Sequence, residues 1–226
     1  MITTAISSSA TAAVRPPKAS PGSADTRQRL VDAAAVLFAD RGFESVTVRE
    51  ICKASNANVA AVNYHFGDKA GLYRAVVMFA IRVMQETNEL SQRAGDGQSP
   101  EAQLRGFVRV FVERLTGDNP NAWIHRLMAR EMQHPTEALE LVMTQVVQPR
   151  VDYLCGVAGA IMELPPADQR VKRSVASLQT QCLIAARKMP APLEKAWGSS
   201  MLELDVAVKH ITDFSLGGMK AIAASR

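Results

Sequence analysis

The stretch Thr47–Phe66, TVREICKASNANVAAVNYHF, decides the fold of this 226-residue chain. It opens on Thr-Val-Arg-Glu, in which a Thr and a Glu three residues later cap a helix start by accepting each other's backbone N–H groups. Asn56 and Asn58 then interrupt the pattern, because Asn tolerates left-handed backbone geometry and is a favoured N-cap residue. The stretch therefore predicts two short capped helices joined by a three-residue turn, the helix-turn-helix arrangement.

The second of these helices has an inward and an outward side. With Val62 taken as facing the core, a rotation of about 100° per residue places Val59 and Phe66 near the inward side. The outward side and its flanks then carry small and polar residues, namely Ala60, Ala61, Asn63 and Tyr64.

The outward residues have the chemistry of a DNA-contacting surface. Small Ala side chains let a helix sit deep in the major groove, and Asn63 is suited to pair with adenine. Tyr64 and Thr47 offer hydroxyls to phosphates. Lys69 lies in the first turn of the next helix, where the helix dipole disfavours a cation unless a phosphate is near; the alternative is a solvated lysine. His65 is equally consistent with a phosphate contact and with a structural histidine.

Helical spacing of apolar residues continues along the rest of the chain, without a strand pattern of period two. We expect an all-α fold of eight or nine helices, with an N-terminal helix-turn-helix bundle and a C-terminal helical dimerisation and sensor domain. The expected division is a disordered arm at 1–24, the DNA-binding domain at 25–70, and the ligand-sensing and dimerisation domain at 71–226.

Individual helix limits follow from caps and breakers. Asp25 is expected to cap the first helix, and Gly42 to end it in a left-handed conformation. Later helices are expected at 68–92, from Ser99-Pro100 onward, and at 121–133, 136–162, 167–187 and 199–224. Pro149 falls inside one of these ranges and predicts a kink or break, since proline lacks a backbone donor and clashes with the preceding turn.

Composition excludes several classes of protein. Lys and Arg exceed Asp and Glu by 26 − 22 = 4, which permits a nucleic-acid partner without requiring one. No apolar run approaches the ~18 residues of a membrane span. The three cysteines are far apart and form no Cys-x-x-Cys pair, which argues against a disulfide framework and a zinc site. We expect a cytoplasmic protein associated with the bacterial nucleoid, without cofactor or metal.

A polar cluster lies on the helix expected at 121–133. It is consistent with the wall of a pocket for a small ligand with a polar head. It is equally consistent with an ion-pair network that holds the two domains together. The candidate ligand-binding residues are Phe107, Phe111, Trp123, Arg126, Arg130 and His134.

The last two long helices carry more apolar surface than one bundle needs. Pairing of these helices across a two-fold axis would form an isologous interface. The expected interface residues are Val171, Val175, Leu178, Cys182, Leu202, Val206 and Phe214.

The run from Asp25 to Val77 resembles the DNA-binding region of TetR/AcrR-family transcription regulators. The resemblance rests on Phe38-x-x-x-Gly42-Phe43, on Thr47 with Ile51, on the NYHF block, and on Lys69 before Leu72. It implies base contacts from Ala60, Ala61 and Asn63, and phosphate contacts from Thr47, Asn58, Tyr64, His65 and Lys69. The chain departs from the commoner pattern in having Asn63 for a Tyr and Asn56 for a turn Gly, so the operator sequence does not transfer.

The segments HRLMAREMQHPTEAL and SLQTQCL are similar to the C-terminal domain of a CerR-like subgroup of these regulators. This resemblance implies a homodimer that binds a double-stranded DNA operator and senses an unidentified small-molecule effector. The expected function is a repressor released from its operator by that effector. One alternative is an activator, or a regulator controlled by a protein partner. The alternative of another class is an all-α enzyme, for which Glu131-x-x-His134 supplies only half of a di-iron motif.

Overall fold

A computed structural model describes residues 21–116, 121–185, 192, 195–196 and 203–225 of the chain. Within these ranges the regular structure is helical and contains no strand. The elements are α1 (Pro21–Arg41), α2 (Val48–Ser55), α3 (Val59–Phe66), α4 (Lys69–Arg93), α5 (Pro100–Leu115), α6 (Trp123–Gln133), α7 (Glu137–Val142), the π-helical turn η1 (Met143–Val147), α8 (Gln148–Met162), α9 (Gln169–Ala185) and α11 (Leu204–Ala224). The expected all-α fold is confirmed, and the described helices number nine when α7, η1 and α8 are taken as one continuous rod.

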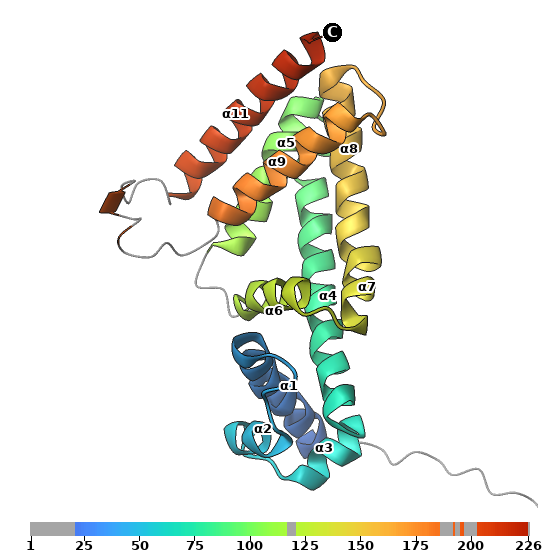
Figure 1. The fold of residues 1–226 in the computed structure, drawn as a ribbon, viewed down its shortest axis with the longest axis vertical. Coiled ribbons are helices and arrows are strands. Elements are labelled where there is room, and N and C mark those ends of the chain that lie inside the picture. Colours follow the sequence, from blue (N-terminus) through green and yellow to red (C-terminus); the bar gives the residue numbers. More distant parts are fainter. Residues whose placement is uncertain (1–20, 117–120, 186–191, 193–194, 197–202, 226) are drawn as a thin grey trace, which may run out of the picture.

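The molecule is elongated, and its two ends are built from different helices (Figure 1). The helices α1, α2 and α3 form a small bundle at one end, whereas α9 and α11 lie side by side at the other. The long helix α4 starts in the small bundle and continues until it lies along α5. The helix α6 crosses between the two ends, next to α1 and α4.

The first helix begins at Pro21, five residues before the start that an N-cap at Asp25 predicts. Asp25 is therefore not its N-cap. It lies inside the helix, where its carboxylate is 3.4 Å from Nε of Arg29, one turn further on. The expected arm at 1–24 is wrong in its last four residues, which are helical, and residues 1–20 lie outside the described part of the chain. The other end of α1 is as predicted, since Gly42 has φ +83° and its N–H donates to Phe38 O.

Buried apolar side chains form two separate cores. The first joins α1, α2, α3 and the first half of α4 to α6 and to one side of α7 and η1. The second joins α5, α8, α9 and α11. The expected domain boundary at residue 70 falls at the start of α4, but α4 contributes to the first core as far as Met84. The N-terminal unit is thus completed by α6, which comes from much later in the sequence.

Pro149 does not break its helix. The turn just before it, η1, is π-helical, and the rod then continues as α8 (Figure 1). A wider turn moves the proline ring away from the carbonyls that it would meet in an α-helix. Side chains of α4 bind carbonyls of this turn: Gln85 donates to Gln145 O at 3.3 Å and Asn88 to Val146 O at 3.0 Å. The expected kink is therefore replaced by a π-helical turn that α4 stabilises.

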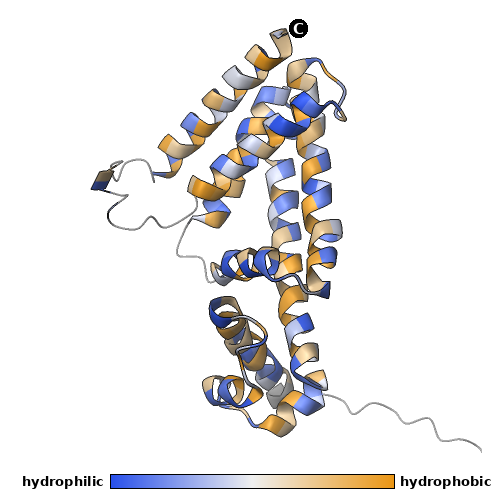
Figure 2. Ribbon diagram, in the orientation of Figure 1, coloured by the Kyte–Doolittle hydropathy of each residue, from blue (hydrophilic) through white to orange (hydrophobic). Residues whose placement is uncertain are grey.

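Apolar and polar residues alternate along the helices, and none of the coloured helices is apolar throughout (Figure 2). In agreement with this, no helix among the described residues combines the length and the hydropathy of a bilayer span.

Candidate nucleic-acid interface

The start of α2 is fixed by the predicted capping box. The backbone N–H of Glu50 donates to the Thr47 hydroxyl oxygen at 3.3 Å, and the Thr47 N–H donates to the Glu50 carboxylate at 2.8 Å. The Thr47 hydroxyl also donates to that carboxylate at 2.7 Å, and Arg41 forms an ion pair with it, also at 2.7 Å. The Thr47 hydrogen bonds, followed by those from Arg41, lower the pKa of Glu50 to about 2. Thr47 remains exposed at the end of the helix.

The turn between α2 and α3 has the geometry that its two asparagines predict. Asn56 is left-handed, with φ 51° and ψ 47°, and its N–H donates to Cys52 O. Asn58 is the N-cap of α3, and its Oδ1 accepts from Ala61 N at 2.8 Å. Because Oδ1 is used in capping, the Nδ2 group of Asn58 remains as the part of the side chain available for a phosphate.

The predicted faces of α3 are largely confirmed. Val62 is fully buried, whereas Ala60 and Asn63 are exposed and Tyr64 is 62% exposed. Val59 was expected on the inward side, but it is 44% exposed because it opens the helix beside the exposed turn.

Two further residues predicted to contact DNA, Ala61 and His65, are half-buried on the same helix. The exposed Tyr64 ring and the half-buried His65 ring meet edge to face at 4.9 Å. Ala61 is half-buried beside them on the same helix. Of the residues predicted to contact bases and phosphates from α3, Ala60, Asn63 and Tyr64 are thus exposed, and Ala61 and His65 are half-buried.

Lys69 has structural partners that the sequence did not indicate. Its ammonium group donates to Phe43 O at 2.9 Å and to Val46 O at 3.1 Å, and it lies 4.3 Å from the centroid of the Phe43 ring. Carbonyl oxygens therefore compensate this cation at the start of α4, where the sequence suggested either a phosphate or solvent. Lys69 holds the loop between α1 and α2 against α4, and any phosphate contact would come from its third proton.

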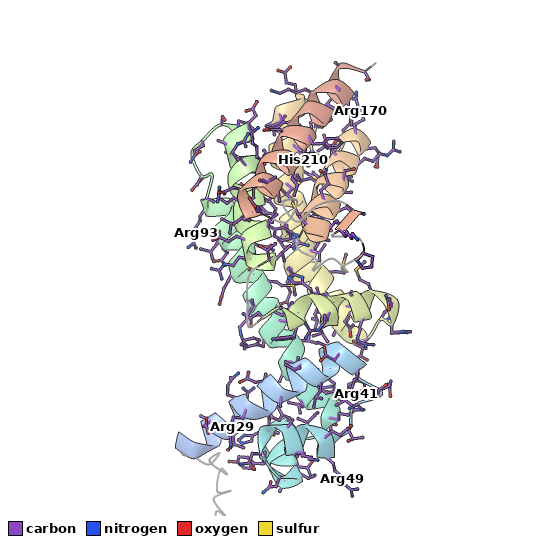
Figure 3. All side chains as sticks on the ribbon, turned by 90° about the vertical axis from the view of Figure 1, so that its left-hand side faces the viewer. Arg29, Arg41, Arg49, Arg93, Arg170 and His210 are labelled. Atoms are coloured by element: carbon purple, nitrogen blue, oxygen red, sulfur yellow. The ribbon has the colours of Figure 1, made fainter. Side chains whose placement is uncertain are left out.

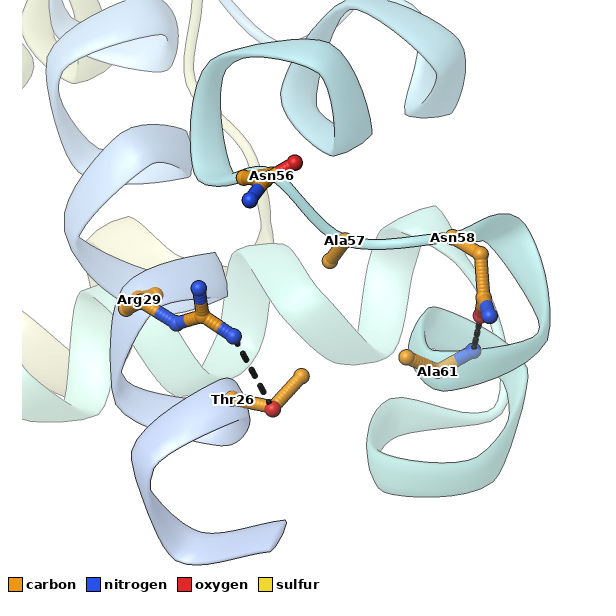
Figure 4. Close-up of a pocket in the computed structure, with 6 residues that line it drawn as sticks. All are labelled: Thr26, Arg29, Asn56, Ala57, Asn58 and Ala61. Atoms are coloured by element: carbon orange, nitrogen blue, oxygen red, sulfur yellow. Dashed lines mark hydrogen bonds between the residues drawn. The ribbon is translucent and has the colours of Figure 1, made fainter. Parts of the chain in front are cut away.

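A shallow cleft of about 350 Å³ lies between α1 and the α2–α3 turn (Figure 4). Arg29 and Thr26 project into it from α1, with Arg29 donating to the Thr26 hydroxyl at 3.2 Å. The opposite wall is Asn56, Ala57, Asn58 and Ala61. Sequence reasoning missed Thr26 and Arg29, because only the tertiary fold brings the start of α1 beside the turn.

The same end of the molecule carries further arginines. Arg29, Arg41 and Arg49 all lie in the N-terminal bundle, and Arg49 extends from α2 away from the rest of the protein (Figure 3). Arginines at this end of the molecule offer partners to a polyanion, since phosphate contacts supply much of the affinity for DNA.

The polar cluster of α6 joins the two parts of the chain. Arg126 forms an ion pair with Asp40 at 2.8 Å. Arg130 Nε donates to Ala39 O at 2.9 Å, and its Nη2 donates to Asp40 O. These carbonyls belong to the last turn of α1, which leaves such groups without partners inside the helix. Of the two readings that the sequence left open, this arrangement matches the ion-pair network between the domains.

The remaining candidate ligand residues are spread over two places. Trp123 stacks on Phe79 of α4 at 6.1 Å in the first core, whereas Phe107 and Phe111 stack at 5.3 Å in the second. His134 is exposed at the end of α6. The structure therefore does not bring the six candidates together.

Glu131 has a structural partner. Its buried carboxylate accepts from the Tyr73 hydroxyl on α4 and from Thr136, whose hydroxyl is at 2.9 Å. Burial, followed by the Glu131 contact, raises the pKa of Tyr73 far above its usual range. Both oxygens of this carboxylate thus hold α6 to α4 and α7.

The expected dimer residues divide into three groups. Four of them are wrong, since they are almost completely buried in the subunit's own second core: Val171, Val175, Leu178 and Cys182. Leu202 lies outside the described residues. Val206 and Phe214 are exposed on α11, by 48% and 64%. The apolar stripe of α9 therefore packs inside the subunit, and the open surface lies elsewhere on α9 and α11.

Comparisons with known proteins agree with this geometry. Residues 30–76 match the family model described as bacterial regulatory proteins, tetR family, and residues 100–219 match that of the C-terminal domain of the HTH-type transcriptional dual regulator CecR. CecR of Shigella flexneri is 28% identical over 143 residues, which are 59% of this chain and 63% of that protein. The chain thus spans less than two thirds of the length of this curated relative. The subgroup that the sequence motifs indicated is confirmed, under its correct name CecR.

Solved structures share the fold. A TetR-like regulator from Rhodococcus sp. RHA1 superimposes with a TM-score of 0.61 and 23% identity, covering 90% of this chain and 98% of that one. AibR, solved in complex with isovaleryl coenzyme A and operator DNA, gives a TM-score of 0.60 and 18% identity over 85% of this chain and 96% of that one. The exposed helix-turn-helix and the two family matches lead to one assignment: the chain belongs to the TetR family of bacterial transcriptional regulators, with a C-terminal domain of the CecR type.

Proposed function

We propose that the protein is a homodimeric repressor that binds a double-stranded DNA operator and leaves it when a small molecule binds. The observation that carries this proposal is the outward side of α3. There Ala60, Asn63 and Tyr64 are exposed beside the capped helix starts at Thr47 and Asn58. Small residues and an amide suit the major groove, and hydroxyls at helix starts suit phosphates.

The cleft between α1 and the α2–α3 turn extends this surface. Arg29 and Thr26 lie across it from Asn58, and we place a backbone phosphate between them. Arg49 on α2 adds a cation on the same end of the molecule. We therefore assign phosphate contacts to Thr26, Arg29 and Arg49 as well as to Thr47, Asn58, Tyr64 and His65.

The dimer is proposed to form through the exposed sides of α9 and α11. On α11 the apolar residues Val206, Phe214 and Ile222 are exposed by 40% or more, and His210 stacks on Phe214 at 5.9 Å. Leu183 and Ile184 are similarly exposed at the end of the adjacent α9. Apart from the adjacent backbone of α11, no atom of the described residues lies within 4 Å of the positions where Gly217 and Gly218 would carry a Cβ, so a second helix could approach α11 closely. A second copy of the chain would cover this surface isologously.

Release by a ligand is supported by the route from the C-terminal helices to α3. Movement of α6 would move the end of α1, because Arg126 and Arg130 bind it directly. A small change in the spacing of two recognition helices is enough to lose DNA, since the half-sites lie a whole helical turn apart. AibR, a protein of the same fold, has been solved with both a coenzyme A thioester and operator DNA.

The experiment is a footprint of the purified protein on the DNA flanking its own gene, with and without a metabolite library. We expect a protected palindrome whose protection is lost with one class of compound. Uniform, sequence-independent protection would contradict operator binding, and a footprint that no compound changes would contradict ligand release.

A second candidate concerns the sign of regulation. CecR of Shigella flexneri is named a dual regulator, which supports activation as well as repression by proteins with this C-terminal domain. A reporter fused to the protected promoter distinguishes the two, because deletion of the regulator raises expression under repression and lowers it under activation.

A further inference from the structure

Arg150 is a half-buried cation for which the described residues supply no counterion. It lies in the first turn of α8, and its Nε is inaccessible to solvent and has no hydrogen-bond partner. None of the ion pairs between described residues includes it. Its guanidinium carbon lies 5.0 Å from the centroid of the Phe111 ring, which stabilises the cation but accepts no hydrogen bond in the guanidinium plane.

This arrangement is unfavourable for the protein alone. Burial lowers the pKa of Arg150 to about 10, so the side chain still carries its charge at neutral pH. Buried charges in proteins are almost always paired, because removing a charged group from water is unfavourable unless a counterion compensates it. The arginine fork matches a carboxylate, which it binds through two parallel hydrogen bonds.

Aromatic and neutral groups of the described residues lie around Arg150. The Phe111 ring belongs to an aromatic cluster. The centroid of the Phe107 ring lies 5.3 Å from that of Phe111 and 6.0 Å from that of Tyr153. Cys182 of α9 is fully buried, and burial raises the pKa of its thiol to about 12. Burial, with a smaller effect of Arg150, lowers the pKa of His125 on α6, so its imidazole is neutral at neutral pH. One cation among neutral and aromatic groups suits a monoanion with an apolar body.

The backbone places Arg150 in this position by an unusual turn. The π-helical η1 ends two residues before Pro149, and one extra residue in a helical turn rotates all later residues by about 100°. Gln85 and Asn88 hold two carbonyls of η1, so the rotated register is fixed by α4. Turns of this kind occur frequently at functional sites.

We propose that Arg150 binds the carboxylate of an organic acid with an apolar body, and that this acid is the effector of the regulator. The proposal rests on the ligand-released function given above, and it names the chemical class of the ligand. The acid would lie against Phe111 and within reach of His125. Because His125 shares α6 with Arg126 and Arg130, a ligand that displaces α6 would move the end of α1 and with it the DNA-binding bundle.

The test uses the full-length protein and three probes: octanoate, 4-phenylbutyrate and the neutral octanamide. Thermal unfolding and calorimetric titration are measured for the wild type, Arg150→Met, Arg150→Lys and the control Arg93→Met, whose guanidinium is exposed and pairs with Glu89. We expect at least one of the two acids, but not the amide, to raise the Tm of the wild type and of Arg93→Met. Arg150→Met should have a higher Tm than the wild type without ligand, because it removes a charged group whose Nε is buried without a hydrogen-bond partner.

Binding of the acid should weaken by at least about tenfold in Arg150→Met and less in Arg150→Lys, which keeps the charge but loses the fork. Three results would each overturn the proposal. The first is that Arg150→Met is less stable than the wild type although circular dichroism shows a normal fold. The second is that both proteins bind the acid equally. The third is that the wild type binds neither acid.

A second measurement separates this inference from the proposed function. Release of operator DNA by the acid is followed by fluorescence anisotropy for the wild type and for Arg150→Met. If the acid binds at Arg150 but does not release DNA, the carboxylate site is supported and the ligand-released repressor is refuted. Equal release from both proteins would keep the repressor and refute the site.

Discussion

At the scale of single residues, the ionised carboxylate of Glu50 stabilises the start of α2 through its hydrogen bonds with Thr47. The Thr47 hydrogen bonds and Arg41 lower its pKa to about 2 from an ordinary value of 4.5. A carboxyl whose pKa is lowered by folding stabilises the folded state fully above pH 4.5, and this contribution is lost as the pH falls through about 2. The capping box should therefore respond to acid.

The variant Glu50→Gln isolates this effect, because Gln also accepts the Thr47 N–H in a capping box but does not ionise. The difference in unfolding free energy between wild type and variant should be small near pH 2 and should grow until about pH 4.5, above which it is constant. Urea unfolding at a series of pH values measures it. A difference that is the same at pH 2 and pH 6 would show that the charge of Glu50 contributes nothing.

Lys69 has carbonyl partners that the sequence did not indicate, and its phosphate contact stays a prediction. Lys69→Met keeps the aliphatic length but leaves the carbonyls of Phe43 and Val46 without their donor. We expect a loss of about 1–3 kcal/mol in unfolding free energy, the usual cost of orphaned polar groups that are partly buried. Lys53→Met on the exposed side of α2 is the matched control and should change stability little. If both variants unfold at the same urea concentration, Lys69 is a solvated lysine.

At the scale of elements, α6 serves as the C-terminal cap of α1. Arg130→Met removes donors from Ala39 O and Asp40 O and should lower the unfolding free energy by about 1–3 kcal/mol. Arg126→Met removes an ion pair whose side chains are about half exposed, at 50% and 48%, and should cost under about 1 kcal/mol. Chemical denaturation of the two variants compares them directly. A larger loss for Arg126→Met would reverse the assignment.

The elements that sequence alone predicted are those fixed by local chemistry. The capping box at Thr47, the left-handed Asn56 and the N-cap at Asn58 depend only on residues within one helical turn. The π-helical turn before Pro149 was predicted only as a kink, because its stabilising donors, Gln85 and Asn88, lie on another helix. The cleft at Arg29 and the unpaired Arg150 were not predicted, since both depend on contacts between distant segments.

At the scale of the whole molecule, an apolar stripe in a sequence does not reveal whether the subunit or its partner covers it. The stripe of α9 through Leu178 looked like a dimer surface, yet α5, α8 and α11 bury it within the subunit. On α11, by contrast, the predicted residues Val206 and Phe214 are exposed and remain candidates for the interface.

Phe214→Glu tests the dimer surface, because its side chain is 64% exposed and the fold of the subunit does not require it. We expect the wild type to sediment near 49 kDa, twice the chain mass of 24.5 kDa, and the variant to sediment as a folded monomer. Leu178→Glu is the contrasting variant, since Leu178 is fully buried and its replacement should unfold the C-terminal helices. A Phe214→Glu dimer of unchanged stability would place the interface on another surface.

The central claim is that α3 reads a DNA sequence through Asn63, and one measurement tests it most directly. The operator found by footprinting and a scrambled duplex of equal length are titrated with wild type and with Asn63→Ala, and binding is followed by fluorescence anisotropy. The account predicts that the variant loses about 1–3 kcal/mol of binding free energy for the operator and nearly none for the scrambled duplex. Unchanged operator affinity in Asn63→Ala, or an equal loss for both duplexes, would contradict it.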